Sequence, residues 1–375
     1  MIYLDYAATT CIHPEVLESY NKVCNEYIGN PHSLHKLGIK SKELINSATA
    51  QIAELLNINE DEIIYTSGAT EANNMALINT CLANEKLGKH IIVSKLEHPS
   101  IYNICDFLEK KGYKIDYVKN KNNGVIDFDD LKKLIKKDTV LISICGVNSE
   151  IGVRQPLKLI RQVIKKENIN TLFHSDITQG IGKVNINFSD LDLATFTAHK
   201  FFGPQGIGVL YKKTKVKMNP FVIGSDNELI GGTPPTSLIV ALSKALRIAL
   251  KDLNKKEEMI QKLRDKICNV LLKYENIVFN QSDFCIPHII NISIPGVNPE
   301  TFIHALEEEE IYISSNTACS KGKMSTAVYA ITENKKIASS TLRISLSDQT
   351  TNAEVNTFLF YFDQVYKKLI DLGEK

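Results

Sequence analysis

The sequence is poor in two residue types, since it contains no tryptophan and only five arginines among its 44 basic residues. A net charge of +1 excludes a general electrostatic attraction to nucleic acid or to an anionic membrane. No apolar run reaches the roughly 20 residues that a membrane-spanning helix needs. We therefore expect a soluble protein without a membrane or nucleic-acid partner. An arginine inside an apolar segment, such as Arg343, is a candidate for binding a carboxylate or phosphate.

The eight cysteines are scattered, with no C-x-x-C pair and no regular spacing. This pattern argues against a disulfide framework and against a zinc site. His32 and His35 have no evident third ligand, so no metal site is expected. The segment from Met1 to Tyr6 is strand-like and lacks the features of a signal peptide, which favours a reduced, cytoplasmic protein. Ordinary packing or surface positions are expected for Cys81, Cys105, Cys145, Cys268, His13, His288 and His304.

A chain of 375 residues favours two domains. Helical and strand-like segments alternate through its first two thirds, which is typical of an α/β domain with a largely parallel sheet. Such a sheet binds its ligand at the carboxyl ends of the strands. Seven short apolar segments are the predicted strands: Glu62–Thr66, His90–Ser94, Lys114–Val118, Val140–Ile144, Thr171–His174, Leu193–Thr197 and Gly208–Tyr211.

The pattern changes beyond about residue 235 and predicts a smaller α+β domain. We place the large domain at residues 12–250 and the small one at residues 1–11 and 251–375. The predicted elements of this second part are a long helical region from Ser237 to about Tyr274, a strand at Ile289–Ile294, a helix at Glu300–Glu309, a strand at Ile311–Ser314 and a final helix from Asn352.

Lys200 is the strongest single signal of chemistry, because it follows a predicted buried strand directly. Asp176 lies at the end of the stretch Thr171-Leu172-Phe173-His174-Ser175-Asp176, just after the preceding predicted strand, and Gln179 stands three residues further on. A pyridoxal-phosphate enzyme needs an amine for a Schiff base and a carboxylate facing the pyridinium nitrogen. Lys200 and Asp176 match that pair, and Gln179 is placed to reach the phenolic oxygen of the cofactor.

A turn of small residues, Thr66-Ser67-Gly68-Ala69-Thr70, lies between a predicted strand and a helix. Free backbone N–H groups at such a helix start suit an anion, and Thr70 adds a hydroxyl. The turn does not match a nucleotide-binding Walker loop, since no G-K-[ST] follows. We interpret it as a phosphate cradle.

These motifs, taken in order, resemble the NifS/IscS family of cysteine desulfurases over nearly the whole chain. The stretches that carry the resemblance are Tyr3–Thr10, Gly29-Asn30-Pro31-His32-Ser33-Leu34-His35, Thr66–Glu71, Glu97-His98, 147–152, Asp176-x-x-Gln179, Ala198-His199-Lys200, Thr317-Ala318-Cys319-Ser320 and Ser340–Leu346. The resemblance implies fold type I of the pyridoxal-phosphate enzymes, with a mainly parallel seven-stranded sheet between helices.

The resemblance also implies the role of each matching residue. Lys200 holds the cofactor and moves the α-proton, while His98 stacks on the ring. Asp176 pairs with the ring nitrogen and Gln179 with the phenolic oxygen. Asn148 and Arg343 bind the carboxylate of L-cysteine. The remaining cofactor-binding residues of the same subunit are Ala69, Thr70, Thr197 and His199. In a homodimer, the partner subunit's Thr233 completes this set.

Cys319 is implied to attack the sulfur of the bound cysteine, which leaves L-alanine and a protein persulfide. Its neighbours, Ser314 to Lys323, are polar and basic, which suits a reactive thiolate. The long segment between Cys319 and Arg343 resembles the long-loop branch of the family. Enzymes of that branch give their sulfur to acceptor proteins that include iron–sulfur scaffolds and tRNA-thiolation enzymes.

The sequence departs from the family at three positions: Asn227 and Ile230 stand where arginines are usual, and Ser149 replaces an asparagine. We expect a weaker positive potential near the phosphate, and still an active enzyme. Two alternatives stay open. One is another fold-related pyridoxal enzyme, such as an aminotransferase or a selenocysteine lyase, and Cys319 is the discriminating residue because an aminotransferase has no need of it. A non-catalytic homologue is suggested by the missing arginines.

Overall fold

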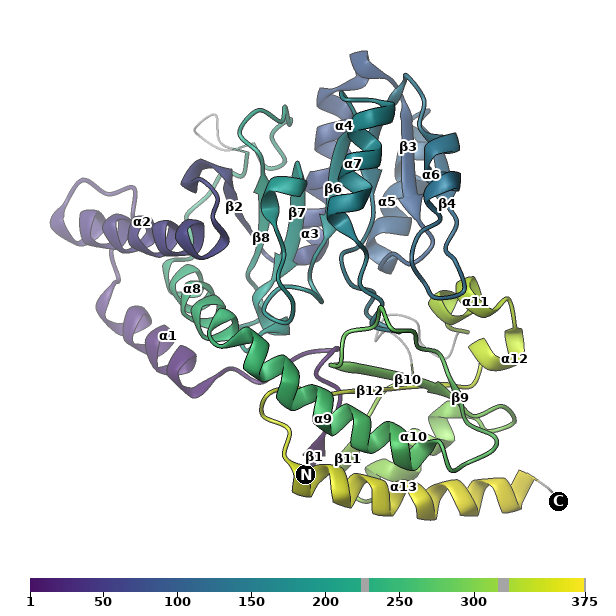
Figure 1. The fold of residues 1–375 in the computed structure, drawn as a ribbon. Coiled ribbons are helices and arrows are strands. Elements are labelled where there is room, and N and C mark those ends of the chain that lie inside the picture. The colour runs from purple at the N-terminus through teal and green to yellow at the C-terminus, as the bar shows by residue number, and fades with distance from the viewer. Residues whose placement is uncertain (224–228, 316–323, 374–375) are drawn as a thin grey trace.

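The computed structural model describes residues 1–223, 229–315 and 324–373, and a seven-stranded sheet forms its centre (Figure 1). The strand order is β2-β8-β7-β6-β5-β3-β4, and only β8 runs antiparallel to its neighbours. The strands are β2 (Ile63–Thr66), β3 (His90–Ser94), β4 (Lys114–Val118), β5 (Thr139–Ser143), β6 (Leu172–Asp176), β7 (Leu193–Thr197) and β8 (Gly208–Lys212). The predicted α/β class and mainly parallel sheet are confirmed.

Both faces of this sheet are covered by helices. Successive side chains of a strand point to opposite faces, so each strand contributes to the core on both sides. Ile92 and Ile142 join one apolar cluster, whereas Ile91 and Leu141 join another on the opposite face. The first cluster also takes side chains from α1 (Pro14–Glu26), α2 (Lys36–Leu56), α6 (Phe128–Leu134), α7 (Leu157–Glu167) and α8 (Thr236–Leu250). The second takes them from α3 (Ala69–Asn74), the π-helical turn Met75–Asn79, α4 (Thr80–Ala83) and α5 (Pro99–Lys110).

A second, smaller part gathers around a three-stranded antiparallel sheet in the order β12-β10-β9 (Figure 1). The N-terminal strand β1 pairs in parallel with β11, so the first residues of the chain lie in this part. A separate apolar cluster, which includes Leu4 and Phe362, forms its core. Its elements are β1 (Ile2–Tyr3), α9 (Leu253–Leu271), β9 (Val278–Phe279), β10 (Ile289–Ser293), α10 (Pro299–Glu307), β11 (Ile311–Tyr312), α11 (Thr326–Thr332), α12 (Lys335–Ala338), β12 (Thr341–Ser345) and α13 (Asn352–Gly373). The boundaries of 12–250 and 251–375 stay a prediction.

The helical region predicted for Ser237–Tyr274 consists of two helices, α8 and α9, with a break between them that was not predicted. Asp252 adopts a left-handed backbone (φ 54°), which aspartate tolerates better than most residues. Lys256 of α9 then donates to the carbonyl oxygens of Ile248 (2.8 Å) and Ala249 (3.4 Å), which lie in the last turn of α8. A side chain thus satisfies α8 carbonyls at the point where the helix ends.

Smaller differences concern the packing residues. Cys81, Cys105 and Cys145 are buried as predicted, but Cys268 is only partly buried. His288 is buried in the structure, whereas His304 is exposed. Within residues 1–223, 229–315 and 324–373, no helix is long and apolar enough to cross a membrane, and no three His, Cys, Asp or Glu side chains gather around a possible metal position.

Candidate active site

A cavity of about 500 Å³ opens where several strands of the large sheet end. Asp176 is the last residue of β6, and Lys200 lies three residues beyond the end of β7. Ten of the predicted site residues line this one cavity: Ala69, Thr70, His98, Asn148, Asp176, Gln179, Thr197, His199, Lys200 and Arg343. Thr233 is exposed and does not line the cavity of its own chain. Cys319 lies outside the described residues.

Lys200 sits at the end of a short 3₁₀ turn, Ala198–Lys200, that continues directly from β7. Its ammonium donates to two backbone carbonyl oxygens, those of Ala7 (2.8 Å) and Ala8 (2.6 Å). The carbonyl of Ala7 also accepts from the amide nitrogen of Gln179 at 2.7 Å. The N-terminal segment is therefore part of the site, although its sequence carries no side chain that would signal this role.

Asp176 and His98 are joined through two residues that the sequence did not single out, Asn73 and Ser100. The amide of Asn73 donates to Asp176 Oδ2 (2.9 Å) and to the hydroxyl of Ser100 (3.1 Å). That hydroxyl lies 2.9 Å from Nδ1 of His98. Burial lowers the pKa of His98, so the imidazole is neutral at pH 7. The carboxylate and the imidazole are held in one network, which is how a site keeps two reactive groups in register.

A buried histidine, His174, extends this network behind Asp176. Its Nδ1 lies 2.9 Å from the hydroxyl of Ser143, and its Nε2 lies 3.3 Å from that of Thr195. Thr195 in turn donates to Asn73 Oδ1 at 2.5 Å. Burial lowers the pKa of His174 to about 4, so this group is uncharged. His174 stands two residues before Asp176 on the same strand, and that period-two spacing was a signal available in the sequence.

The predicted phosphate cradle lies between β2 and α3, and its backbone is closely packed. Gly208 of β8 runs against it, since a Cβ at that position would lie 2.8 Å from Cα of Gly68. At Gly68 itself a Cβ would meet only the hydroxyl oxygen of Thr197, at 3.8 Å. The cradle is therefore closely packed on the side of Gly208 and open on the side of the cavity.

Two predicted phosphate ligands, Thr197 and His199, already have partners in the chain. The Thr197 hydroxyl donates to the carbonyl oxygen of Ile207 at 2.9 Å, and it keeps its lone pairs as acceptors. Nδ1 of His199 lies 3.0 Å from the hydroxyl of Thr9. Burial, with Lys200 next to it, lowers the pKa of His199 to about 4. A neutral His199 keeps one nitrogen for a ligand.

Arg343 is almost completely buried in β12 and reaches the cavity from the smaller part of the protein. Its Nη2 pairs with Asp5 at 2.8 Å, and its Nη1 donates to the carbonyl oxygen of Ser149 at 3.0 Å. Asn148 shapes the same loop, because its Oδ1 accepts from the backbone N–H groups of Glu150 and Ile151. Asp5 was not predicted from the sequence, and it orients the guanidinium.

Glu97 is a buried carboxyl group next to His98. One of its oxygens accepts from the Ser94 hydroxyl (2.6 Å) and from the backbone N–H of Cys145 (2.7 Å). The other oxygen has no hydrogen-bond partner within the described residues. Burial, assisted by the charge of Asp176, raises the pKa of Glu97 from 4.5 to about 8. Glu97 is therefore mostly protonated at pH 7.

Glu97→Gln is expected to increase stability at alkaline pH relative to the wild type. Protonated Glu97 favours the folded state fully below about pH 4.5, and this contribution is lost as the pH rises toward about 8. Glutamine does not titrate, so over that pH range the free energy of unfolding of the variant should rise, relative to that of the wild type, by on the order of 4 kcal/mol. Urea denaturation of both proteins at several pH values measures this difference. A difference that stays constant with pH would contradict a buried, protonated carboxyl.

The chain belongs to the aminotransferase class-V family, which matches residues 2–358. Within this family its relatives are of the NifS/IscS type. It is 38% identical to the NifS/IcsS protein homolog of Lactobacillus delbrueckii subsp. bulgaricus, over 100% of both chains. It is 36% identical to cysteine desulfurase IscS of Dictyoglomus turgidum, over 98% of this chain and 95% of that protein. A solved NifS-like protein superposes with a TM-score of 0.93 at 31% identity, over 98% of this chain and 100% of the other.

Proteins of this family depend on pyridoxal phosphate, and the residues of the cavity fit that cofactor. An amine, a carboxylate and an imidazole line one space beside a turn of small residues. The buried hydroxyl of Thr178 also lines it and has no hydrogen-bond partner within residues 1–223, 229–315 and 324–373. A cavity with polar groups left for a ligand matches a polar, phosphorylated cofactor.

Proposed function

We propose that the protein is a cysteine desulfurase, which converts L-cysteine to L-alanine and transfers the sulfur to Cys319 as a persulfide. The observation that carries the proposal is that Lys200, Asp176 and His98 line one cavity with Arg343. Relatives that match nearly the whole chain are named cysteine desulfurases, which supports the same activity. Iron–sulfur cluster assembly or the thiolation of tRNA and cofactors is the use that we propose for this sulfur.

Each residue of the cavity has a distinct part in this proposal. When bound, pyridoxal phosphate withdraws electrons from the α-carbon of the substrate. Lys200 holds the cofactor covalently and moves the α-proton through its amine. Asp176, which accepts a hydrogen bond from Asn73, would face the ring nitrogen and keep it protonated. His98 would lie against the ring, and Ala69, Thr70, Thr197 and His199, which line the same cavity, would hold the phosphate.

The substrate carboxylate is assigned to Arg343 and Asn148. Arg343 is a fixed charge, because Asp5 and the carbonyl of Ser149 orient its guanidinium. Its terminal nitrogens each keep one further N–H for the bidentate geometry that carboxylates favour. An amino acid whose carboxylate binds Arg343 would then have its α-carbon on the side of Lys200, because both residues line the same cavity.

The sulfur transfer is assigned to Cys319, which the described residues flank on both sides of its segment. Before the segment, Ser314 donates to Asp5 at 3.0 Å and exchanges backbone hydrogen bonds with Arg343. After it, the Ser325 hydroxyl donates to the buried carboxyl of Glu150 at 2.5 Å. Both ends are thus tied to residues next to the substrate-binding loop, and this supports a thiol that works in the cavity.

The transfer balances without an external oxidant. The Cys319 thiolate attacks the substrate sulfur, an S–S bond forms, and the bond between that sulfur and the substrate β-carbon breaks. The electron pair of the broken bond stays on carbon, which takes up a proton and becomes the methyl group of alanine. Cys319 carries the sulfur as a persulfide until an acceptor protein removes it.

We further propose that the protein acts as a homodimer in the cytoplasm. Thr233 is exposed and does not line its own cavity, which suits a contact with the cofactor phosphate of the other subunit. Large apolar side chains are exposed at Ile28, Leu34 and Ile223, as an interface requires. Ile230, at a usual arginine position, packs against the apolar cluster of α3 to α5 instead.

The cytoplasmic location is supported by the cysteines. The seven described cysteines are free thiols, in keeping with a reducing compartment.

Incubation of the purified protein with L-cysteine and a thiol reductant tests the activity directly. Equal amounts of L-alanine and sulfide are expected, together with a visible absorbance band of the bound cofactor. Tryptic mass spectrometry of a parallel sample, incubated with L-cysteine but without the reductant, should find one added sulfur atom on Cys319. Formation of a keto acid in place of alanine would indicate an aminotransferase, and a colourless protein without turnover would indicate a non-catalytic homologue.

A further inference from the structure

Lys183 is a buried lysine that the reaction as described does not use. It follows Gln179 by four residues, and its ammonium donates to Gln179 Oε1 at 2.7 Å. The amide nitrogen of Gln179 donates to the carbonyl oxygen of Ala7 at 2.7 Å. An ammonium can only donate and a carbonyl oxygen can only accept, so the two contacts define which way the Gln179 amide is turned.

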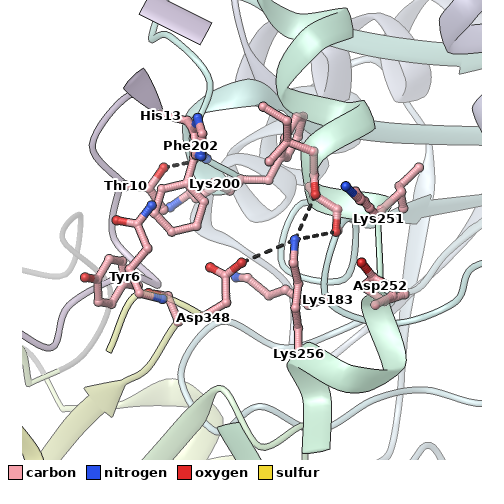
Figure 2. A pocket seen from close by; sticks show the side chains of 18 of the residues that line it. Tyr6, Thr10, His13, Lys183, Lys200, Phe202, Lys251, Asp252, Lys256 and Asp348 are labelled. Carbon is pink, nitrogen blue, oxygen red and sulfur yellow. Dashed lines mark hydrogen bonds and ion pairs between the residues drawn. The ribbon is translucent and has the colours of Figure 1, made fainter. Parts of the chain in front are cut away.

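Lys183 and Gln179 line two different cavities. Gln179 lines the cavity of Lys200 and Asp176, whereas Lys183 does not. Lys183 lines a second cavity of about 770 Å³, in which Figure 2 shows it together with Lys200. Lys200 belongs to both cavities. The ammonium of Lys183 therefore does not line the first cavity itself, but it contacts Gln179, which does.

The burial of this lysine is costly, which argues that it has a task. Desolvation, with Lys200 and Arg343 next in effect, lowers the pKa of Lys183 to about 7. His288, also in the second cavity, is neutral, because burial and the charge of Lys183 lower its pKa to about 3. Within the described residues no carboxylate forms an ion pair with Lys183. A buried amine without a counter-charge bears the desolvation cost of its charged form, and the hydrogen bond to Gln179 Oε1 offsets part of that cost.

We propose that Lys183 is a positioning residue that turns the Gln179 amide so that its nitrogen, rather than its oxygen, is presented to the cofactor. This inference rests on the proposed role of Gln179 as a donor to the phenolic oxygen. Without Lys183, only the Ala7 carbonyl would oppose a turned amide, which would present its oxygen, an acceptor, to an oxygen that carries negative charge. The ammonium of Lys183 disfavours that orientation further, because it would then face the NH₂ group of the amide, which is also a donor.

The consequence is spectroscopic and does not depend on turnover. A donor at the phenolic oxygen stabilises negative charge there and weakens the hold of that oxygen on a nearby proton. The pH at which the visible absorbance band of the bound cofactor changes is therefore lowered by Gln179. Loss of Lys183 should raise that midpoint by about 1 pH unit, since one charge-assisted contact is removed.

The experiment titrates the visible band of the cofactor-loaded protein with pH, in the absence of substrate, in Lys183→Met and Gln179→Leu variants and their combination. Both single variants are expected to raise the midpoint, and the double variant should match Gln179→Leu alone, because Lys183 acts only through the amide. Lys183→Arg should stay near the wild-type midpoint. Lys251→Met removes an exposed lysine of the same second cavity, labelled in Figure 2, and should change nothing.

Each other result is decisive in its own way. A raised midpoint in Gln179→Leu with an unchanged one in Lys183→Met overturns the role of Lys183. Additive shifts in the double variant overturn it too, because they mean that Lys183 acts independently of the amide. An unchanged midpoint in Gln179→Leu instead overturns the assignment of Gln179 in the proposed function. Lys183→Gln, one bond too short for the 2.7 Å contact, is measured in parallel and gives the same comparison should the methionine variant not fold.

Discussion

Lys200→Ala is expected to abolish cysteine desulfurase activity, with a loss of at least about 10³-fold in alanine formation. Two functions leave with the amine, the covalent hold on the cofactor and the movement of the α-proton. Neither has a substitute at the same place, because His98 and His199 are held by Ser100 and Thr9. Borohydride reduction followed by mass spectrometry should attach the cofactor to position 200 in the wild type and to no residue in the variant.

The fold should survive this substitution. The carbonyl of Ala7 keeps its hydrogen bond from Gln179, so only the carbonyl of Ala8 loses its described side-chain donor. We expect an unchanged far-UV circular dichroism spectrum. Lys215→Ala, at an exposed lysine beyond β8, serves as the matched control and should retain full activity. A Lys200→Ala protein that still makes alanine at a comparable rate would contradict the assignment.

The large sheet could be predicted from the sequence because its strands are short apolar runs, buried on both faces and separated by helices. Three of the seven, at His90–Ser94, Lys114–Val118 and Leu193–Thr197, have their predicted bounds, and the others differ by one or two residues at their ends. The break between α8 and α9 was missed for a physical reason. It depends on a left-handed Asp252 and on capping by Lys256, and neither interrupts the periodicity of apolar residues.

The candidate site likewise contains residues that the local sequence identifies and residues whose roles depend on contacts between distant segments. Lys200 and Asp176 follow strands of one sheet, so the topology alone brings their ends together. Asn73, Asp5 and Lys183 have no such signal, since their roles arise from contacts across the fold. Asn73 meets Asp176 over 103 positions, and Asp5 meets Arg343 over 338. A single sequence shows the residue types but not these pairings.

Cys319→Ala is expected to reduce alanine and sulfide formation from L-cysteine by more than about 10²-fold while the visible band of the cofactor remains. The substitution leaves the described lining residues of the cavity unchanged, among them Lys200, Asp176 and Arg343, so the cofactor site should stay intact. It lacks the thiolate that accepts the sulfur, so the bond between substrate sulfur and β-carbon has no nucleophile to break it. The spectrum on adding L-cysteine should therefore change once and then stay, since binding proceeds and turnover does not.

A matched control separates this role from the general reactivity of thiols. Cys24 is exposed on α1 and its removal as Cys24→Ala should leave both activity and persulfide formation unchanged. Undiminished alanine formation by Cys319→Ala would show that another nucleophile accepts the sulfur. In that event Cys11, the other exposed thiol among the described residues, is the next position to examine for the persulfide. Loss of the visible band in Cys319→Ala would instead assign the residue to cofactor binding, because a sulfur acceptor has no part in holding the cofactor.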